Sequence, residues 1–481
     1  MKQGREGELR RPSVPDRAFT IAFVFLLLAA AAVRIPPLFS DFWQDEIWSL
    51  NFALSLSSPF KIFTTASFDN NHPLNTFFLW LVGAANRWEP YRIPSLLAGF
   101  ATAGLMGVAG RLWGRAAALA SLMLGGFSSI LVLYATEARG YAAAVFFSLA
   151  AFLLLERRLA RPTPAPLLLF WLSVLLGQFS HGSFFFVYAG LLCWSSLRVL
   201  SARRPPREGL RELLVLQLVP LAVVLGYFLW FRTVTIGGGD PYLVSEVLRE
   251  LATYSFGLPL RSPWPEFLGL AILGCALGEI VQLAREKRDL WVFFLVVLAA
   301  PFVLLALSRP AMLFPRYFLV AIPFLLLLLG RGFSRLWMSG MAGRGVAGAV
   351  LGLFLLGNGV NLAALYRDGR GHYLEALAFM SSNTAGPAIT VSSDYDFRIR
   401  PLVDFYAARL PREKPVVYVT QAMLKGGAAA EWVICHNTDN DPQPGFGTSF
   451  DAGHGRFYAL VKSYPFAWLS GVRWFVYRRI T

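Results

Sequence analysis

The stretch AFTIAFVFLLLAAAAVRIPPLFSDFWQDEIWSL, residues 18–50, determines the fold class of this chain. Its first half is an apolar run long enough to cross a hydrocarbon core about 30 Å thick. Its second half places three carboxylates, Asp41, Asp45 and Glu46, directly after that run. A basic leader precedes the run and no small-residue cleavage site follows it, so we expect an uncleaved first span.

Similar apolar runs recur along the chain. Of its 481 residues, 56% are hydrophobic and only 15% are charged, whereas soluble proteins carry about 25% charged residues. The composition therefore predicts a polytopic membrane protein. The candidate runs after the first are residues 73–88, 94–112, 116–136, 140–156, 165–181, 183–200, 213–233, 265–283, 290–308, 316–332 and 344–365.

The positions of Lys and Arg predict which runs cross the membrane. Positive charges are retained on the cytoplasmic side, and the basic clusters all fall there if residues 73–88 form a helix that lies at the interface. The result is a polytopic α-helical membrane protein of about 11 transmembrane helices, with a cytoplasmic N-terminus. The predicted parts are a basic cytoplasmic segment (1–17), a transmembrane module (18–365) with interfacial helices in its outer loop (39–93), and a periplasmic domain (366–481).

The C-terminal part changes character after about residue 366. It is polar enough to be soluble, and it alternates short apolar strands with helical stretches, which predicts an α/β domain. The expected helix is 400–410, and the expected strands are 387–393, 415–420, 431–437 and 456–462.

The sequence argues against a nucleic-acid-binding protein, against a disulfide framework or thiolate metal site, and against a phosphate-binding loop. The net charge of +15 lies in short clusters between apolar runs, without a basic stripe or a nucleic-acid motif, so no nucleic-acid partner is expected. Cys193, Cys275 and Cys435 are far apart, which argues against a disulfide framework and a thiolate metal site. The GGGD turn at residues 237–240 reads as a flexible loop, because no strand and helix flank it as a phosphate loop requires.

The acids that follow the first span are the clearest chemical signal. Carboxylates beside a membrane surface cost desolvation and mutual repulsion unless something uses them. The alternative is a solvated loop with ordinary acids. A carboxylate such as Asp45 is well placed to take a proton from a hydroxyl or an amine.

Two further segments place charges at the predicted outer boundary. YATEARGY, residues 134–141, carries Glu137 and Arg139, and LFPRYF, residues 313–318, carries Arg316. An arginine at this depth holds a phosphate by a fork of hydrogen bonds, although snorkelling is the simpler account of such a residue. Arg309 is a weaker candidate of the same kind.

Two histidines also lie in predicted outer segments. His181 in GQFSHGSFF stands alone, and a lone histidine is more often structural than part of a site. His72 in DNNHPLN either caps the interfacial helix or lines a cavity.

Taken together, these segments resemble the GT-C membrane glycosyltransferases, in the family that includes the protein O-mannosyltransferases and the lipid A aminoarabinose transferases. The resemblance covers about residues 18–335. It rests on motifs whose order and common sidedness are more specific than any one of them: Asp45-Glu46, His72-Pro73, RIPSLLAG from Arg92, TEARGYA from Thr136, Ser180-His181 and Arg316-Tyr317.

The resemblance implies a polyprenyl-phosphate-linked sugar as donor and an inverting displacement at the anomeric carbon. The implied catalytic carboxylates are Asp45 as general base, Glu46 as the residue that orients the loop, and Glu137. Several members carry an aspartate near the position of Tyr141, and Glu137 is the nearest acid here. Arg139 and Arg316 would bind the donor phosphate, and the substrate cavity would be lined by His72, Tyr141, His181 and Tyr317. No cofactor and no metal are expected, because arginines suffice to stabilise a phosphate leaving group.

The implied partners are the polyprenyl-phosphate sugar donor, membrane lipid and an envelope acceptor, which is a protein, lipid A or a glycan. The expected location is the cell inner membrane, with the acceptor on the periplasmic face. Two other classes stay open: a lipid or polysaccharide transporter or flippase, and a non-catalytic envelope assembly factor. Transporters place ionisable residues near the bilayer midplane and often show internal repeats, whereas the charges here lie at the outer boundary and no repeat is visible.

Overall fold

The apolar runs form the helices that the sequence predicts, and the chain is an integral membrane protein. The computed structural model describes residues 17–65, 68–202, 205–235, 243–259, 264–308, 313–410, 414–437, 443–467, 469 and 471–480. Seven helices in these ranges are long and apolar enough to span a membrane, and shorter apolar helices pack among them. The total of about 11 spans stays a prediction.

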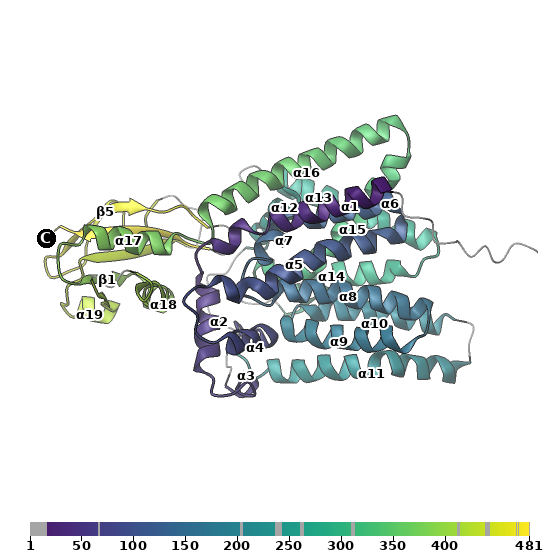
Figure 1. Cartoon of the computed structure of the whole chain (residues 1–481), viewed down its shortest axis with the longest axis horizontal. Helices are drawn as coiled ribbons and strands as arrows, with labels where there is room; N and C mark the ends of the chain where they lie inside the picture. The colour runs from purple at the N-terminus through teal and green to yellow at the C-terminus, as the bar shows by residue number, and fades with distance from the viewer. Residues whose placement is uncertain are drawn as a thin grey trace, which may run out of the picture.

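The helices of the membrane module share one bundle, with a smaller α/β domain at one end (Figure 1). The bundle contains α1 (Arg17–Ala32), η1 (Pro36–Phe39), α2 (Gln44–Ser55), α3 (Lys61–Thr64), α4 (Pro73–Val82), α5 (Glu89–Gly110), η2 (Arg111–Trp113), α6 (Arg115–Phe127), α7 (Ser129–Tyr134), α8 (Tyr141–Ala160), α9 (Pro164–Ser180), α10 (Phe184–Leu200), α11 (Pro206–Phe231), α12 (Val244–Phe256), α13 (Trp264–Arg285), α14 (Leu290–Ser308), η3 (Pro315–Ala321), α15 (Ile322–Met338) and α16 (Met341–Asp368).

One predicted run is broken in the structure. Residues 116–136 form α6 and α7 rather than one helix, because Ser128 adopts an extended backbone conformation between them. The Ser129 N–H donates to Asn358 Oδ1 (2.7 Å), and the Ser128 hydroxyl donates to the Ser255 carbonyl (3.0 Å). Asn358 thus replaces the carbonyl that the Ser129 N–H would bond in a continuous helix, so the break stays satisfied inside the bundle.

The segment between the predicted runs 213–233 and 265–283, in which no helix is predicted, contains α12 (Val244–Phe256). This helix packs against both α7 and α16, and its last residues supply the carbonyl that Ser128 uses. The GGGD turn and Arg309 lie outside the described residues.

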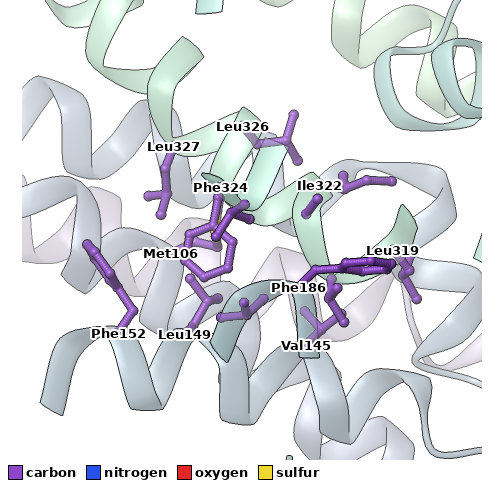
Figure 2. Packing of buried hydrophobic residues seen from close by; sticks show 14 of the residues in the cluster. Met106, Val145, Leu149, Phe152, Phe186, Leu319, Ile322, Phe324, Leu326 and Leu327 are labelled. Atoms are coloured by element: carbon purple, nitrogen blue, oxygen red, sulfur yellow. The ribbon is translucent and has the colours of Figure 1, made fainter. Parts of the chain in front are cut away.

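The bundle interior is filled by interdigitated apolar side chains. Figure 2 shows residues of α5, α8, α10, η3 and α15 meeting in this core. Phe152 of α8 packs against Phe293 of α14 with ring centroids 4.7 Å apart. Because lipid tails are as apolar as these side chains, close packing rather than the hydrophobic effect holds such helices together.

Basic residues of two of the clusters predicted to lie on the cytoplasmic side form ion pairs near the ends of neighbouring helices. Arg158 at the end of α8 pairs with Glu212 near the start of α11 at 2.7 Å. Arg331 of α15 pairs with Glu279 and Glu286 near the end of α13. The outer-loop helices α2, α3 and α4 lie at the opposite end, next to the C-terminal domain (Figure 1).

The C-terminal domain is a mixed sheet covered by helices. Its strand order is β2-β1-β3-β6-β5-β4, with β2, β1 and β3 parallel and the other pairs antiparallel. The predicted strands and the amphipathic helix are confirmed, whereas α17, α19, β4 and β6 were not predicted. The elements are α17 (Tyr373–Asn383), β1 (Ile389–Ser393), α18 (Asp396–Ala407), β2 (Val416–Tyr418), α19 (Gln421–Lys425), β3 (Trp432–Asn437), β4 (Ser449–Asp451), β5 (Phe457–Ser463) and β6 (Arg473–Arg479).

The segment after the first span joins the domain to the bundle. The Asp41 carboxylate accepts a hydrogen bond from the Leu374 N–H at the start of α17 (2.9 Å). The Tyr406 hydroxyl donates to the Phe42 carbonyl (2.7 Å), and the Phe42 ring stacks on Phe405 at 5.5 Å. Asp41 is therefore a docking residue for the domain, which leaves Asp45 and Glu46 of the three acids as candidates for the site.

The contact between α16 and the end of α12 gives a stability prediction. A Cβ at Gly357 would lie 1.8 Å from the Gly257 carbonyl oxygen, whereas a Cβ at Gly359 in the same helix would meet nothing within 4 Å. Gly357→Ala should therefore destabilise the protein by about 1–3 kcal/mol and lower its melting temperature in detergent. Gly359→Ala is the matched control, and it should keep or raise the melting temperature through helix propensity. Equal melting temperatures for the two variants would contradict this packing.

Candidate active site

Asp45 lies where α2 begins, between two arginines from distant segments. Its Oδ2 is 2.7 Å from Arg139 Nη1 and 3.6 Å from Arg316 Nη1. Arg139 comes from the loop between α7 and α8, and Arg316 from η3 at the start of a membrane helix. Asp45 and Arg139 are buried, with 8% and 2% of their surface exposed. The convergence that the sequence predicted from sidedness is therefore present in the structure.

A cluster of rings surrounds these charges. His72 lies edge-on to Tyr141 (4.9 Å) and to His181 (4.8 Å), and the Tyr141 and His181 rings are 4.6 Å apart. Tyr317 stacks on His181 at 6.5 Å. The Arg139 Nη2 donates to the Tyr141 hydroxyl (3.4 Å). The four residues predicted to line the cavity thus form one aromatic wall beside Arg139; that they line a substrate cavity stays a prediction.

Both histidines in this wall are neutral. Burial, reinforced by the positive charges of Arg139 and Arg316, lowers the pKa of His181 to about 3 and the pKa of His72 well below its ordinary value. His72 Nδ1 accepts a hydrogen bond from the Gly140 N–H (2.9 Å), and His181 Nδ1 accepts one from the Ser183 N–H (3.1 Å). Each neutral ring therefore carries its proton on Nε2. Neither ring therefore carries a positive charge, and the Nε2–H group of each is available to donate to a ligand.

The Asp45 carboxylate is ionised in this setting. Burial alone would raise its pKa, but the charges of Arg139 and Arg316 outweigh burial and hold the pKa below its ordinary value. One carboxylate faces two guanidinium groups, so these three side chains carry one positive charge in excess. In the described part of the chain, Arg139 Nε also has no hydrogen-bond partner.

Glu46 points to a different partner. Its carboxylate is completely buried and pairs with Arg92 of α5 at 2.6 Å. The same carboxylate accepts hydrogen bonds from the N–H groups of Ala138 (2.6 Å) and Trp43 (3.1 Å). Glu46 therefore joins the start of α2, the loop that carries Arg139, and α5. This geometry fixes where Asp45 and Arg139 meet.

Glu137 also forms a buried pair away from Asp45. Its Oε1 is 2.9 Å from Arg370 Nε, and both side chains are about fully buried. The Arg370 guanidinium packs 4.0 Å over the Trp43 ring and donates to the Leu469 carbonyl (3.0 Å). Arg370 thus connects Glu137 and Trp43 to the C-terminal domain.

No role for Arg370 was predicted from the sequence. It lies in Asp368-Gly369-Arg370-Gly371-His372, where both glycines adopt positive φ angles of 56° and 146°. Two glycines around one arginine allow the sharp path that turns this side chain inward. The sequence pattern that could have identified Arg370 is a basic residue between two glycines, directly after the last membrane helix.

No family model and no curated protein matches this sequence. Solved structures do match. ArnT from Cupriavidus metallidurans in the apo state has 14% identity and a TM-score of 0.53, with 87% of this chain and 93% of that chain covered. The same protein bound to undecaprenyl phosphate matches at 13% identity over the same shares, with a TM-score of 0.50.

An archaeal structure shows a similar likeness. The Archaeoglobus fulgidus oligosaccharyltransferase tethered with an acceptor peptide has 12% identity and a TM-score of 0.51. The match covers 84% of this chain but only 64% of that longer one. At these identities the comparisons establish the fold, which is that of the GT-C membrane glycosyltransferases, as the resemblance implied.

Within the described residues, no group of three or more His, Cys, Asp or Glu side chains is arranged to hold a metal ion. The predicted metal independence stays a prediction. The site roles of the predicted residues are likewise proposals.

The Glu137 pair gives a pH prediction. Burial, opposed by Arg370, raises the pKa of the Glu137 carboxyl from 4.5 to about 7. The folded protein therefore holds a proton that the unfolded chain releases, and the resulting stabilisation is complete below pH 4.5 and is lost as the pH rises through 7. Relative to wild type, Glu137→Gln should gain about 3 kcal/mol between pH 4.5 and pH 8.

Melting temperatures of the two proteins across this pH range check the prediction. Glu208→Gln, an exposed change in the first turn of α11, serves as the control and should follow wild type. A constant difference between wild type and Glu137→Gln would contradict the assigned protonation.

Proposed function

We propose that this chain, which has the GT-C fold, transfers a sugar from a polyprenyl-phosphate donor to an envelope acceptor at the periplasmic face of the cell inner membrane. The observation that supports the proposal is the convergence of Asp45, Arg139 and Arg316 in one buried cluster of charges. The ArnT structure that matches with undecaprenyl phosphate bound supports a lipid phosphate as the ligand of this fold.

The excess positive charge favours a phosphate donor. A buried charge without a partner costs several kcal/mol in free energy, and one carboxylate does not balance two guanidinium groups. The phosphodiester of a lipid-linked sugar carries one negative charge, which brings the three side chains and the donor to neutrality. Arg139 Nε and the planar fork of each guanidinium supply directed hydrogen bonds to phosphate oxygens.

The place of Arg316 suits a lipid donor. Arg316 follows Pro315 at the first residues of a helix that is long and apolar enough to span the membrane. A phosphate bound there leaves the polyprenyl tail level with the hydrocarbon core. A water-soluble sugar nucleotide would gain nothing from that depth.

Donor binding also prepares the base. When the donor phosphate takes over contacts with Arg139 and Arg316, Asp45 loses part of its stabilisation and gains a negative neighbour. Both changes raise the proton affinity of the carboxylate. Asp45 therefore becomes a stronger base only when the donor is in place, which protects the enzyme from abortive chemistry.

The proposed reaction is a single displacement at the anomeric carbon. The acceptor oxygen or nitrogen attacks the anomeric carbon from the side opposite the phosphate, and its proton passes to Asp45. The bond between the anomeric carbon and the phosphate oxygen breaks, and the electron pair leaves with the phosphate. Arg139 and Arg316 stabilise the negative charge that develops there, and the configuration at the anomeric carbon is inverted.

Two of the predicted catalytic carboxylates take supporting roles in this proposal. Glu46 holds α2, α5 and the loop that carries Arg139 together through its contacts with Arg92 and Ala138. Glu137 holds Arg370 in place. His72 and His181, as neutral donors, are suited to bind sugar or phosphate oxygens without adding charge.

Asp45→Asn tests the assignment directly. The amide keeps the size of the side chain but accepts no proton, so transfer from a polyprenyl-phosphate sugar should fall by about 10²–10⁴-fold. The measurement is product formation by purified protein, with the melting temperature as a check on folding. Asp41→Asn is the matched control in the same segment: the amide oxygen still accepts the hydrogen bond from the Leu374 N–H that docks α17, so this variant should keep activity within a few-fold of wild type.

Wild-type transfer rates in Asp45→Asn would refute the general-base role. If wild-type protein moved donor lipid between leaflets without any transfer, the flippase alternative would replace the proposed enzyme.

A further inference from the structure

A row of aromatic rings leads from the candidate active site onto the C-terminal domain. Trp48 of α2 lies 5.0 Å from Phe397 of α18, measured between ring centroids. Phe397 lies 6.2 Å from Tyr395, and Tyr395 stacks on His436 at 5.9 Å with an interplanar angle of 10°. We call these four residues the aromatic row. It joins two parts of the chain that are far apart in sequence.

The middle of the aromatic row is open to solvent. Phe397 is 62% exposed and Tyr395 is 44% exposed. Both belong to a polar, soluble domain, where neighbouring exposed rings are unusual and mark a binding surface more often than a structural one. Neither ring is part of the buried clusters that hold the domain together.

The far end of the row is polar and fixed. His436 Nδ1 is 2.9 Å from Asp394 Oδ1, and the His436 N–H donates to Asp394 Oδ2 (2.9 Å). Because the carboxylate accepts both hydrogen bonds, Nδ1 carries the proton and Nε2 keeps a lone pair that is able to accept. The pair is oriented as a hydrogen-bonding group for a ligand.

The topology places this pair where open parallel sheets bind ligands. Asp394 and His436 lie at the carboxyl ends of β1 and β3, which are neighbours in the sheet. The chain passes from β1 to β2 on one side and then across β1 to β3 on the other. Ligands of such sheets bind outside the carboxyl ends of the strands, where the strand order reverses.

The near end of the row adjoins the proposed chemistry. Trp48 follows Asp45 by three residues in α2, so the two side chains emerge from the same side of the helix, about one turn apart. A ligand on the aromatic row would thus extend from the Asp394–His436 pair toward the base.

We propose that the aromatic row binds a saccharide acceptor, which rests on the proposed function and narrows its acceptor from any envelope molecule to a glycan. The faces of sugar rings carry C–H groups that pack on the exposed Phe397 ring and against the edge of Tyr395, whose ring also contacts His436 and the Arg398 guanidinium (5.8 Å), while sugar hydroxyls donate to His436 Nε2. A peptide suits this surface less well, because the row crosses the ends of strands and offers no strand edge for backbone pairing.

Direct binding of soluble oligosaccharides to the purified full-length protein tests this proposal. The probes are chitotetraose and the core oligosaccharide released from lipopolysaccharide by mild acid, with dissociation constants measured by calorimetry. Phe397→Ala and Tyr395→Ala should each weaken binding of the oligosaccharide that wild type binds by about tenfold, equal to 1.4 kcal/mol. Phe457→Ala, which removes a 44% exposed ring from β5, is the matched control and should bind like wild type.

Each outcome decides the proposal. Weaker binding by the two row variants, with melting temperatures and undecaprenyl phosphate binding unchanged, supports it. Absence of saturable binding of either oligosaccharide to wild type, equal affinities in all variants, or tighter binding of an aromatic peptide of similar size overturns it. If oligosaccharide binding depends on the row but no sugar transfer is detected, the surface stands and the proposed enzymatic function fails.

Discussion

The ion pairs of Asp45 with Arg139 and Arg316 are the interaction on which the rest of this structure depends. Charges at a membrane boundary are costly to bury, and a carboxylate between two arginines is stable only if every element that carries them is held in place. The surrounding structure does this with a second layer of pairs. Glu46 and Arg92 lock α2 to α5, and Glu137 draws Arg370 in from the start of the C-terminal domain.

The bundle and the domain contribute in different ways. Packed helices bring the outer ends of α7, α9 and η3 to one place, and the broken run at Ser128 turns the chain into the loop that carries Arg139. The domain contributes through the segment that follows the first span, since Asp41 and Phe42 bind α17 and α18. The same short segment therefore carries the proposed base and anchors the domain that we propose binds the acceptor.

Much of this arrangement was predictable from the sequence, because sidedness is a strong constraint. Once the basic clusters are assigned to one face, Asp45, Arg139 and Arg316 must share the other, and their meeting follows. The helices were predictable from the length and composition of their apolar runs.

The features that were not predicted depend on contacts between residues far apart in the sequence. The break at Ser128 is stabilised by the hydrogen bond from the Ser129 N–H to Asn358, 229 positions away in the chain. No local sequence pattern predicts this bond. Arg370 looked like an ordinary basic residue after a membrane helix until Glu137 and Trp43 were placed around it. The Asp394–His436 pair likewise exists only through the pairing of β1 with β3.

A structure of the protein with undecaprenyl phosphate bound tests whether the two arginines hold the donor phosphate. We expect the phosphate to contact Arg139 and Arg316, and Asp45 to move out of its 2.7 Å contact with Arg139. A phosphate bound elsewhere, with that contact intact, would contradict it.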